Sequence, residues 1–203
     1  MENSWELSSK LADSVCYLLG LDPTPCHTGW ALYDRADGQF TYGVFEPPKT
    51  VTEDLPRMEY MLEEVFGLLP PDPGFDAKTI FVVIEGLAFN GRGSYALQLA
   101  GLGYILRREF RNREIAYREV APTQAKKFLT GKGNCDKNLI LKEVFKRYSI
   151  DVDDDNIADA VNFNMIGRAL LGWNQPSNQA QASVIEALKA GPKPKKARKS
   201  KAA

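Results

Sequence analysis

The stretch between Tyr17 and Leu32 constrains the fold more than any other part of the chain. An apolar run, Tyr17–Leu21, ends in a single carboxylate, Asp22, and a second apolar run begins at Thr28 after a short loop. This pattern predicts a buried strand that carries Asp22 at its end, followed by a return into a neighbouring strand. An ionised Asp is costly at such a place unless it is paired, and a bound cation is the usual partner. The alternative is an Asp that only stabilises the turn after the strand.

The composition is that of an ordinary folded domain. The 203 residues are 44% hydrophobic, which predicts one domain with a substantial core. No apolar run approaches the roughly 18 residues of a membrane span, and Met1–Ser4 lacks the basic-then-apolar pattern of a signal peptide. We therefore expect a cytoplasmic protein without a membrane partner. The three cysteines form no Cys-x-x-Cys pair, and Cys26 stands beside the only His of the chain, so we expect reduced thiols and no zinc site.

The net charge of zero conceals two concentrated basic regions. Residues 105–147 carry 12 basic and 5 acidic side chains. Residues 191–203 contain six basic side chains and no acid: Lys193, Lys195, Lys196, Arg198, Lys199 and Lys201. Two such regions in a neutral protein suggest contact with a polyanion. A solubilising tail and an ordinary solvated helix face are the alternative.

Hydrophobic periodicity predicts the order of the remaining elements. Asp37-Gly38 is a hairpin signal, so strands at 28–33 and 40–45 should pair antiparallel. Further strands are expected at 79–85 and 115–120, and helices at 53–69, 95–110, 122–129, 136–148 and 156–171. The later strands return through helical crossovers and must lie parallel to the first. The expected fold is α/β: a mixed five-stranded sheet, an antiparallel meander plus parallel strands, with helices on both faces.

This order divides the chain into three parts. Residues 1–14 are expected as a short lead-in, residues 15–175 as the folded domain, and residues 176–203 as a basic tail. Because like charges repel and few apolar residues lie among them, we expect the tail to be partly helical at most and otherwise mobile.

Three acidic residues should meet at one edge of this sheet. Asp22 and Glu85 end neighbouring strands, and Asp159 lies in the first turn of the last helix, with Asp155 and Asn156 close enough to share its face. Converging carboxylates repel one another unless cations lie among them, and oxygen-only ligands select Mg²⁺ or Mn²⁺. Two such ions about 4 Å apart would activate a water and stabilise the leaving oxygen of a phosphodiester. Acids that merely complement a helix N-terminus are the alternative.

The same residues resemble a known family. The segments that carry the resemblance are Gly20–Pro23 with Thr28–Trp30, Val83–Glu85, Ala158–Ala160, and the basic segment from Ala121 through Gly131–Gly133 to Lys137. They are similar to the RuvC family of Holliday-junction resolvases. The resemblance covers roughly residues 15–172. It implies a ribonuclease H-like fold, a homodimer and Mg²⁺-dependent cleavage of branched DNA, as by a crossover junction endodeoxyribonuclease.

The resemblance also assigns roles to individual residues. By matching position, Asp22, Glu85 and Asp159 would hold the metal ions. Lys126 and Lys137 would approach the scissile backbone, with Lys132 in the same basic segment. The loop that carries Phe89 and Arg92 would enter the junction.

The sequence departs from the family pattern at one position. The family usually has an acid or a His three residues before the last Asp, where this chain has Asn156. Either the amide oxygen of Asn156 serves as the fourth ligand or Asp155 replaces it. The basic tail and the Pro-rich insertion resemble divergent, phage-type members, which would place the protein in a host cytoplasm and would fit a relaxed sequence preference.

Two other functions are compatible with parts of the pattern. A non-catalytic protein that binds branched DNA would keep the fold and the basic surface. An ATPase of the actin and sugar-kinase type shares the opening Asp, but 203 residues leave no room for its second domain. If the protein is a nuclease dimer, we expect the two subunits to meet through the helix at 95–110, whose small residues are Ala96, Ala100, Gly101 and Gly103. A close crossing of two helices within one subunit would use the same residues.

Overall fold

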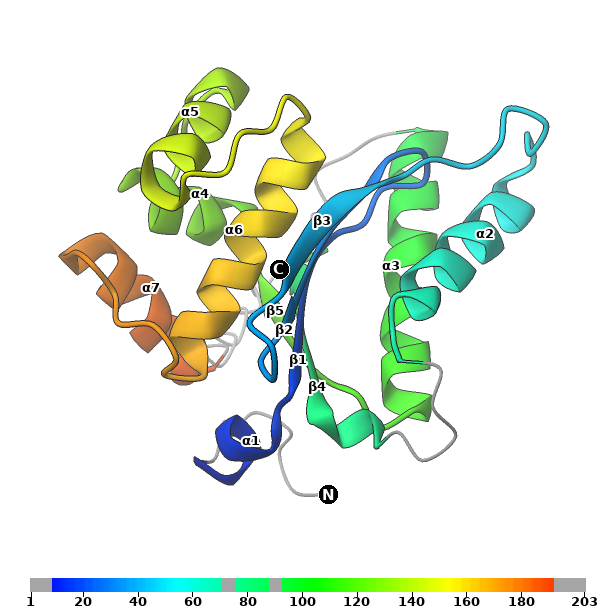
Figure 1. Ribbon diagram of the computed structural model, residues 1–203. Helices are drawn as coiled ribbons and strands as arrows, with labels where there is room; N and C mark the ends of the chain where they lie inside the picture. The colour runs from blue at the N-terminus through cyan, green and yellow to red at the C-terminus, as the bar shows by residue number, and fades with distance from the viewer. Residues whose placement is uncertain (1–8, 71–75, 88–92, 192–203) are drawn as a thin grey trace, which may run out of the picture.

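The computed structural model describes residues 9–70, 76–87 and 93–191, which form a five-stranded sheet in the order β3-β2-β1-β4-β5 (Figure 1). The strands are β1 (Tyr17–Asp22), β2 (Thr28–Asp34), β3 (Phe40–Phe45), β4 (Ile80–Glu85) and β5 (Ala116–Val120). β1 and β3 pair antiparallel with β2, whereas β4 lies parallel between β1 and β5. The predicted fold class, with its meander and its parallel strands, is confirmed.

Helices cover both faces of the sheet. Figure 1 shows α2 and α3 on one face and α4, α5, α6 and α7 on the other. The helices are α1 (Ser9–Ser14), α2 (Asp54–Gly67), α3 (Ser94–Asn112), α4 (Pro122–Thr130), α5 (Lys137–Tyr148), α6 (Asp155–Leu170) and α7 (Gln179–Lys189), and a short 3-10 turn, Ala77–Thr79, precedes β4. Among the described residues, no helix is long and apolar enough to cross a membrane.

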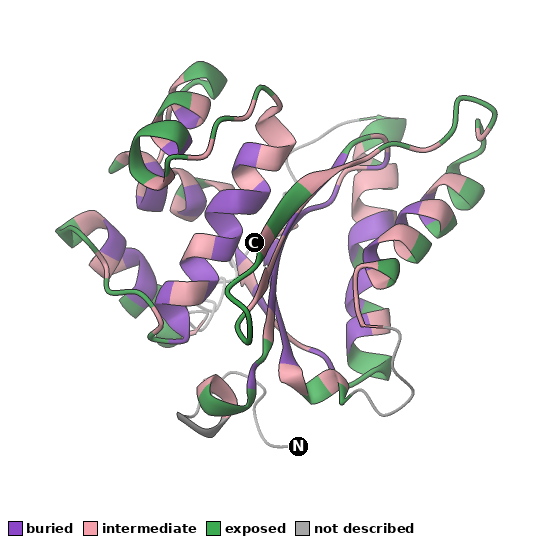
Figure 2. Cartoon of the chain, in the orientation of Figure 1, coloured by how far each residue is buried: buried purple, intermediate pink, exposed green. Residues whose placement is uncertain are grey.

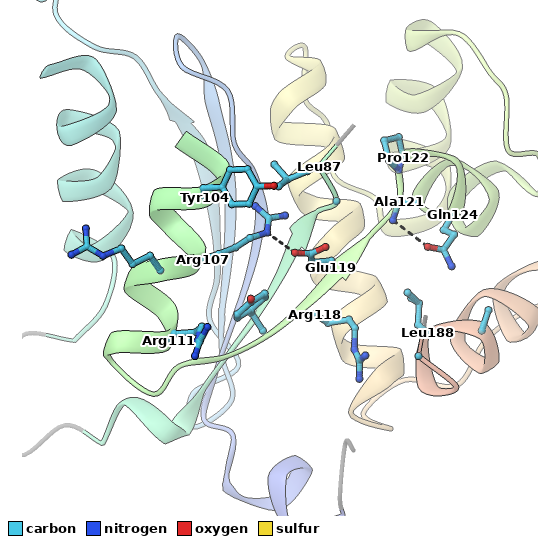
Figure 3. A pocket seen from close by; sticks show the side chains of 15 residues that line it. Leu87, Tyr104, Arg107, Arg111, Arg118, Glu119, Ala121, Pro122, Gln124 and Leu188 are labelled. Carbon is cyan, nitrogen blue, oxygen red and sulfur yellow. Dashed lines mark hydrogen bonds and ion pairs between the residues drawn. The ribbon is translucent and has the colours of Figure 1, made fainter. Parts of the chain in front are cut away.

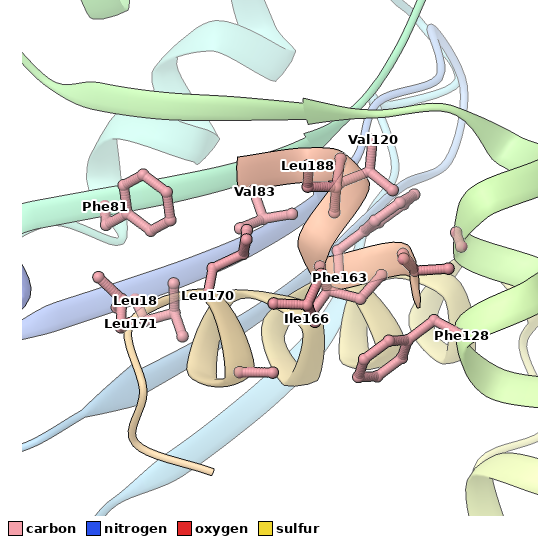
Figure 4. Close-up of a cluster of buried hydrophobic side chains, with 14 of the residues drawn as sticks. Leu18, Phe81, Val83, Val120, Phe128, Phe163, Ile166, Leu170, Leu171 and Leu188 are labelled. Atoms are coloured by element: carbon pink, nitrogen blue, oxygen red, sulfur yellow. The ribbon is translucent and has the colours of Figure 1, made fainter. Parts of the chain in front are cut away.

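The two faces of the central strands carry separate apolar clusters, because side chains alternate along a strand. Leu18 and Val83 belong to the cluster under α4, α6 and α7 (Figure 4), whereas Leu19 and Val82 belong to the cluster under α2 and α3. All four side chains are buried. The strand β4 therefore reads as a continuous apolar run in the sequence, as expected for a strand that is covered on both faces.

The predicted strands and helices after residue 15 are confirmed, with ends that move by one or two residues. The predicted end of the folded domain at residue 175 is wrong. Helix α7 follows it, and its side chains Val184, Ile185 and Leu188 are buried in the same cluster as Leu18 and Val83. The basic residues from Lys193 onward lie outside the described part of the chain.

Helix α6 lies unusually close to the sheet because two strand residues have no side chain. A Cβ added at Gly20 would lie 2.2 Å from the backbone oxygen of Ala160, and one at Gly29 would lie 2.1 Å from that of Asn156. The side chain of Asn164 then reaches the strands and donates to the carbonyl oxygen of Leu18 at 2.8 Å. Figure 2 shows that α6 is buried along most of its length. The two glycines thus fix how near α6 approaches β1.

Candidate functional site

The three predicted acids come together at the carboxyl end of the central strands. Leu21 pairs with Ile84, so the next residues, Asp22 and Glu85, end adjacent parallel strands. Asp159 lies on α6, which Gly20 holds against β1. Asp22 is buried, with 7% of its surface exposed. The sequence interpretation therefore placed these residues correctly at one edge of the sheet.

The charges of these acids act strongly on one another. Burial raises the pKa of Asp22 well above its usual range, and the negative charges of Glu85, Asp159 and Asp155 raise it further. Burial also raises the pKa of Glu85, while a hydrogen bond with Asp22 opposes that change. The same hydrogen bond raises the pKa of Asp22 and lowers that of Glu85, so the pKa values of the two neighbouring acids are pushed apart.

The pKa of Asp159 is also raised. Burial and the neighbouring charge of Glu85 raise the pKa of Asp159 to about 7, although Lys126 and Lys137 act in the opposite direction. Lys126 also lowers the pKa of Glu85. The two lysines that the resemblance assigned to the DNA backbone therefore lie within electrostatic range of the acids.

Lys137 makes a direct ion pair with Asp155, the first residue of α6. This pairing raises the pKa of Lys137, whose side chain is 77% exposed. Lys137 follows Asp136, whose carboxylate accepts a hydrogen bond from the backbone N–H of Leu139 and so caps α5. The cap thus positions Lys137 at the start of α5, facing the start of α6.

The two residues proposed for the fourth acidic position have different surroundings. The Asn156 amide donates to Asp154 Oδ1 at 3.3 Å, and the backbone N–H of Asn156 donates to the same oxygen at 2.8 Å. Asp154 also accepts from the N–H of Ile157 and is the cap of α6. The charge of Asp155, in contrast, raises the pKa of both Asp22 and Asp159. Asp155 is therefore the residue whose charge acts on the cluster.

Arg107 on α3 is a residue of this site that the sequence analysis missed. Its guanidinium is buried and donates from Nε to Glu119 at 2.5 Å (Figure 3). It also donates from Nη1 to the carbonyl oxygen of Gly103 at 2.8 Å and from Nη2 to that of Glu85 at 2.8 Å. Arg107 thereby holds the backbone at the end of β4, and its charge lowers the pKa of Glu85. One sequence signal was available: a basic residue follows Leu106 on the apolar face of a predicted helix.

Three predicted DNA-binding residues are not placed at the cluster. Phe89 and Arg92 lie outside the described residues. Lys132 is exposed in the turn between α4 and α5, where its backbone N–H donates to Thr130 Oγ1 at 3.2 Å. Its contact with DNA stays a prediction.

The residues at this edge fit a hard divalent cation by their chemistry. The acids of the cluster offer carboxylate oxygens, which suit Mg²⁺ and Mn²⁺. Burial first, and the neighbouring carboxylates second, raise the pKa values of Asp22 and Asp159, and Lys126 and Lys137 oppose this change at Asp159. Across residues 9–70, 76–87 and 93–191, no three His, Cys, Asp or Glu side chains are already gathered as a metal-ligand group.

Comparison with known proteins identifies the fold. No family model matches the sequence. The structure of Thermus thermophilus RuvC matches with a TM-score of 0.56 and 16% sequence identity, over 77% of this chain and 96% of that chain. The structure of T. thermophilus RuvC in complex with a Holliday junction substrate matches with a TM-score of 0.55 and 16% identity, over 74% of this chain and 91% of that chain. The chain therefore has the ribonuclease H-like α/β fold that RuvC has.

Proposed function

We propose that this protein is a structure-selective endonuclease that cleaves Holliday junctions or other branched DNA, and so acts in DNA recombination or repair. The observation that carries the proposal is the cluster of Asp22, Glu85 and Asp159, three acids from separate elements that lie close enough for Glu85 and Asp159 to raise the pKa of Asp22, and for Glu85 to raise that of Asp159. Natural proteins rarely keep such destabilising charge at a buried place unless function requires it. The shared fold with RuvC supports a nuclease role, because one RuvC structure holds a Holliday junction substrate.

Asp22, Glu85, Asp159 and Asp155 would hold two Mg²⁺ ions, with Mn²⁺ as a substitute. When bound, such ions supply an activated water and stabilise the leaving oxygen of the phosphodiester. Arg107 orients Glu85 by holding its backbone carbonyl oxygen. The remaining polar side chains of the site would bind the substrate rather than the ions.

Lys126 and Lys137 would contact the phosphates beside the cut. Lys137 is paired with Asp155 in the absence of DNA, and its 77% exposed side chain can exchange that partner for a phosphate. The exchange would free Asp155 for a cation. Binding of DNA and of Mg²⁺ should therefore favour each other.

Cutting two opposed strands of a junction requires two sites, so we propose a two-fold symmetric homodimer. The predicted use of Gly101 and Gly103 at that contact is wrong. A Cβ at Gly101 would meet Met58 at 3.1 Å, and one at Gly103 would meet Leu87 at 2.5 Å, so both glycines pack within the chain. Leu97, which is 75% exposed near the start of α3, is the better candidate for the contact.

Sedimentation with and without junction DNA tests the dimer. We expect a dimer that Leu97→Asp converts into a monomer, while Leu55→Asp, at an exposed leucine of α2, leaves the assembly unchanged. A wild-type monomer even with junction DNA present would contradict the dimer.

Mg²⁺-dependent nicking of a four-way junction, compared with linear duplex of the same sequences, tests the activity. We expect cleavage of the junction only, and its loss in Asp22→Asn with junction binding kept or strengthened, because binding depends on basic side chains. Cleavage by Asp22→Asn within tenfold of the wild type would rule out the assigned site. Junction binding without cleavage by the wild type would instead favour a non-catalytic binding protein.

A further inference from the structure

A groove of about 800 Å³ follows the outer edge of β5, between α3 and the end of α7 (Figure 3). Its lining comes from both faces of the strand. Glu119 points toward α3, where it meets Arg107, and Arg118 extends toward the α7 side, near Leu188. The groove therefore wraps around a free edge of the sheet and is distinct from the acid cluster.

The groove is strongly basic. Its described lining contains four arginines, Arg107, Arg108, Arg111 and Arg118, and one carboxylate, Glu119. Glu119 is already neutralised by Arg107. Arg118 is 4% exposed, and Arg108 and Arg111 are exposed at the rim. A concave surface with exposed guanidinium groups, here those of Arg108 and Arg111, attracts an anionic ligand, and guanidinium groups match phosphates in geometry.

Aromatic side chains lie between these arginines. Tyr104 on α3 is 56% exposed, and Tyr117 on β5 is partly buried. A basic groove with aromatic side chains is the arrangement that binds single-stranded nucleic acid, because bases stack on the rings while the backbone follows the charges.

The ends of the groove also point to a nucleic acid. One end is formed by Gly86 and Leu87, which directly follow Glu85 of the acid cluster. The other end includes Gly191, beside the end of α7. A strand that lies in the groove would thus begin beside the acid cluster.

We propose that the β5-edge groove, through the exposed side chains of Tyr104, Arg108 and Arg111, binds an unpaired strand of nucleic acid that continues from the acid cluster. The inference rests on the proposed function, because the unpaired strand would be part of the branched DNA that the acid cluster cleaves. The groove adds to that function a preference for branched DNA that contains single-stranded segments, such as gaps and flaps, over fully paired junctions.

Binding of a fluorescent oligo-dT of 12 nucleotides, measured in EDTA across a salt series, tests the proposal without cleavage. Tyr104→Ala should weaken binding about tenfold, the loss expected for one stacked base. Arg111→Glu should weaken it and reduce the slope of log K against log salt by about 0.7 for the lost phosphate contact. Two variants are controls: Tyr42→Ala, at an exposed tyrosine of β3, and Arg113→Glu, at the residue that follows α3 and lies outside the groove.

Two outcomes would overturn the groove proposal. The first is oligo-dT binding that Tyr104→Ala and Arg111→Glu leave unchanged, or that the controls weaken equally. The second is a Glu-rich decapeptide that binds the wild type, depends on Arg111 and displaces no oligo-dT, which would assign the groove to an acidic protein partner. Because cleavage plays no part in this assay, oligo-dT binding in the groove without junction nicking would defeat the proposed function and leave the groove standing.

Discussion

At the scale of single residues, the site consists of acids whose pKa values the fold raises and of neighbours that hold them in place. Burial and the neighbouring carboxylates raise the pKa of Asp22. Arg107 contributes in another way, since its three hydrogen bonds join α3, β4 and β5 at the residue that bears one of the acids. Both features predict measurable changes in stability.

The pKa of Asp159 predicts how stability depends on pH. The folded chain holds this proton up to a pH of about 7, whereas the unfolded chain releases it near the ordinary pKa of 3.8. The folded state therefore binds more protons between these values, and without Mg²⁺ its stability should fall as pH rises through this window, by up to about 1.4 kcal/mol per pH unit. Denaturant unfolding in EDTA at pH 4 to 8 measures this slope. Asp159→Asn should make it shallower, and an unchanged slope in that variant would contradict the raised pKa.

Removing the guanidinium of Arg107 should destabilise the protein. Arg107→Met leaves Glu119 without its partner and the Glu85 carbonyl without its donor, which should cost about 1–3 kcal/mol. The neighbouring variant Arg108→Met, at an exposed position, should change stability by less than about 0.5 kcal/mol. Urea unfolding compares the two. Glu119→Gln removes the charge that Arg107 pairs with. If this variant and Arg107→Met are both less stable than the wild type but cleave junctions equally well, Arg107 has a structural role only.

At the scale of elements, the position of α6 against β1 determines the site. The helix carries Asp155 and Asp159, and its distance from the sheet is set by Gly20 and Gly29 rather than by large side chains. Asn164 fastens the helix, since its amide donates to carbonyl oxygens of both β1 and β2 at 2.8 and 3.0 Å. A small displacement of α6 would therefore separate the acids.

Gly20→Ala tests this close packing. The new methyl group would lie 2.2 Å from the backbone oxygen of Ala160, so α6 must move away from β1. We expect the free energy of unfolding to fall by at least about 1–3 kcal/mol and cleavage to be lost. Gly67→Ala, at the end of α2, is the matched control because nothing lies within 4 Å of its added methyl group. We expect this control to be neutral or slightly stabilising. Thermal unfolding of the two variants decides, and equal midpoints would contradict the packing argument.

At the scale of the whole molecule, α7 is the last described helix, and the sequence after Gly191 carries six basic side chains and no apolar residue larger than Ala or Pro. Helix α7 belongs to the core, so a truncation that tests the tail must leave it intact. Six basic side chains without a packed core can neutralise phosphates but cannot hold a fixed geometry. The tail should therefore add affinity for DNA without adding selectivity for its shape.

Removal of residues 192–203 should weaken binding to junction and to duplex DNA by similar factors. The salt dependence should become shallower by several units of slope, and by fewer than about six. Titrations of both DNAs over a salt series measure this, with a full-length variant that carries Gln at the six basic positions as the control for chain length. A truncation that loses affinity for the junction but keeps it for duplex would show that the tail recognises shape.

The sequence by itself determined the sheet and the acids at its edge. The apolar runs that end in Asp22 and Glu85 are local patterns, and the helical crossover between them requires parallel neighbours, so both acids had to reach the same edge. The cap at Asp136 was equally local. Such features follow from residues that lie within a few positions of one another.

Only the tertiary structure decided which residues support that edge. Asn164 bonds to Leu18 across 146 positions of the sequence, and Arg107 bonds to Glu85 across 22. The packing of α7 and of Gly103 within the chain depends in the same way on distant partners. A polar or small residue has the same local preference whether it faces solvent, a dimer or the core. Its role is fixed by what packs against it, because burial and hydrogen bonding are properties of the assembled fold.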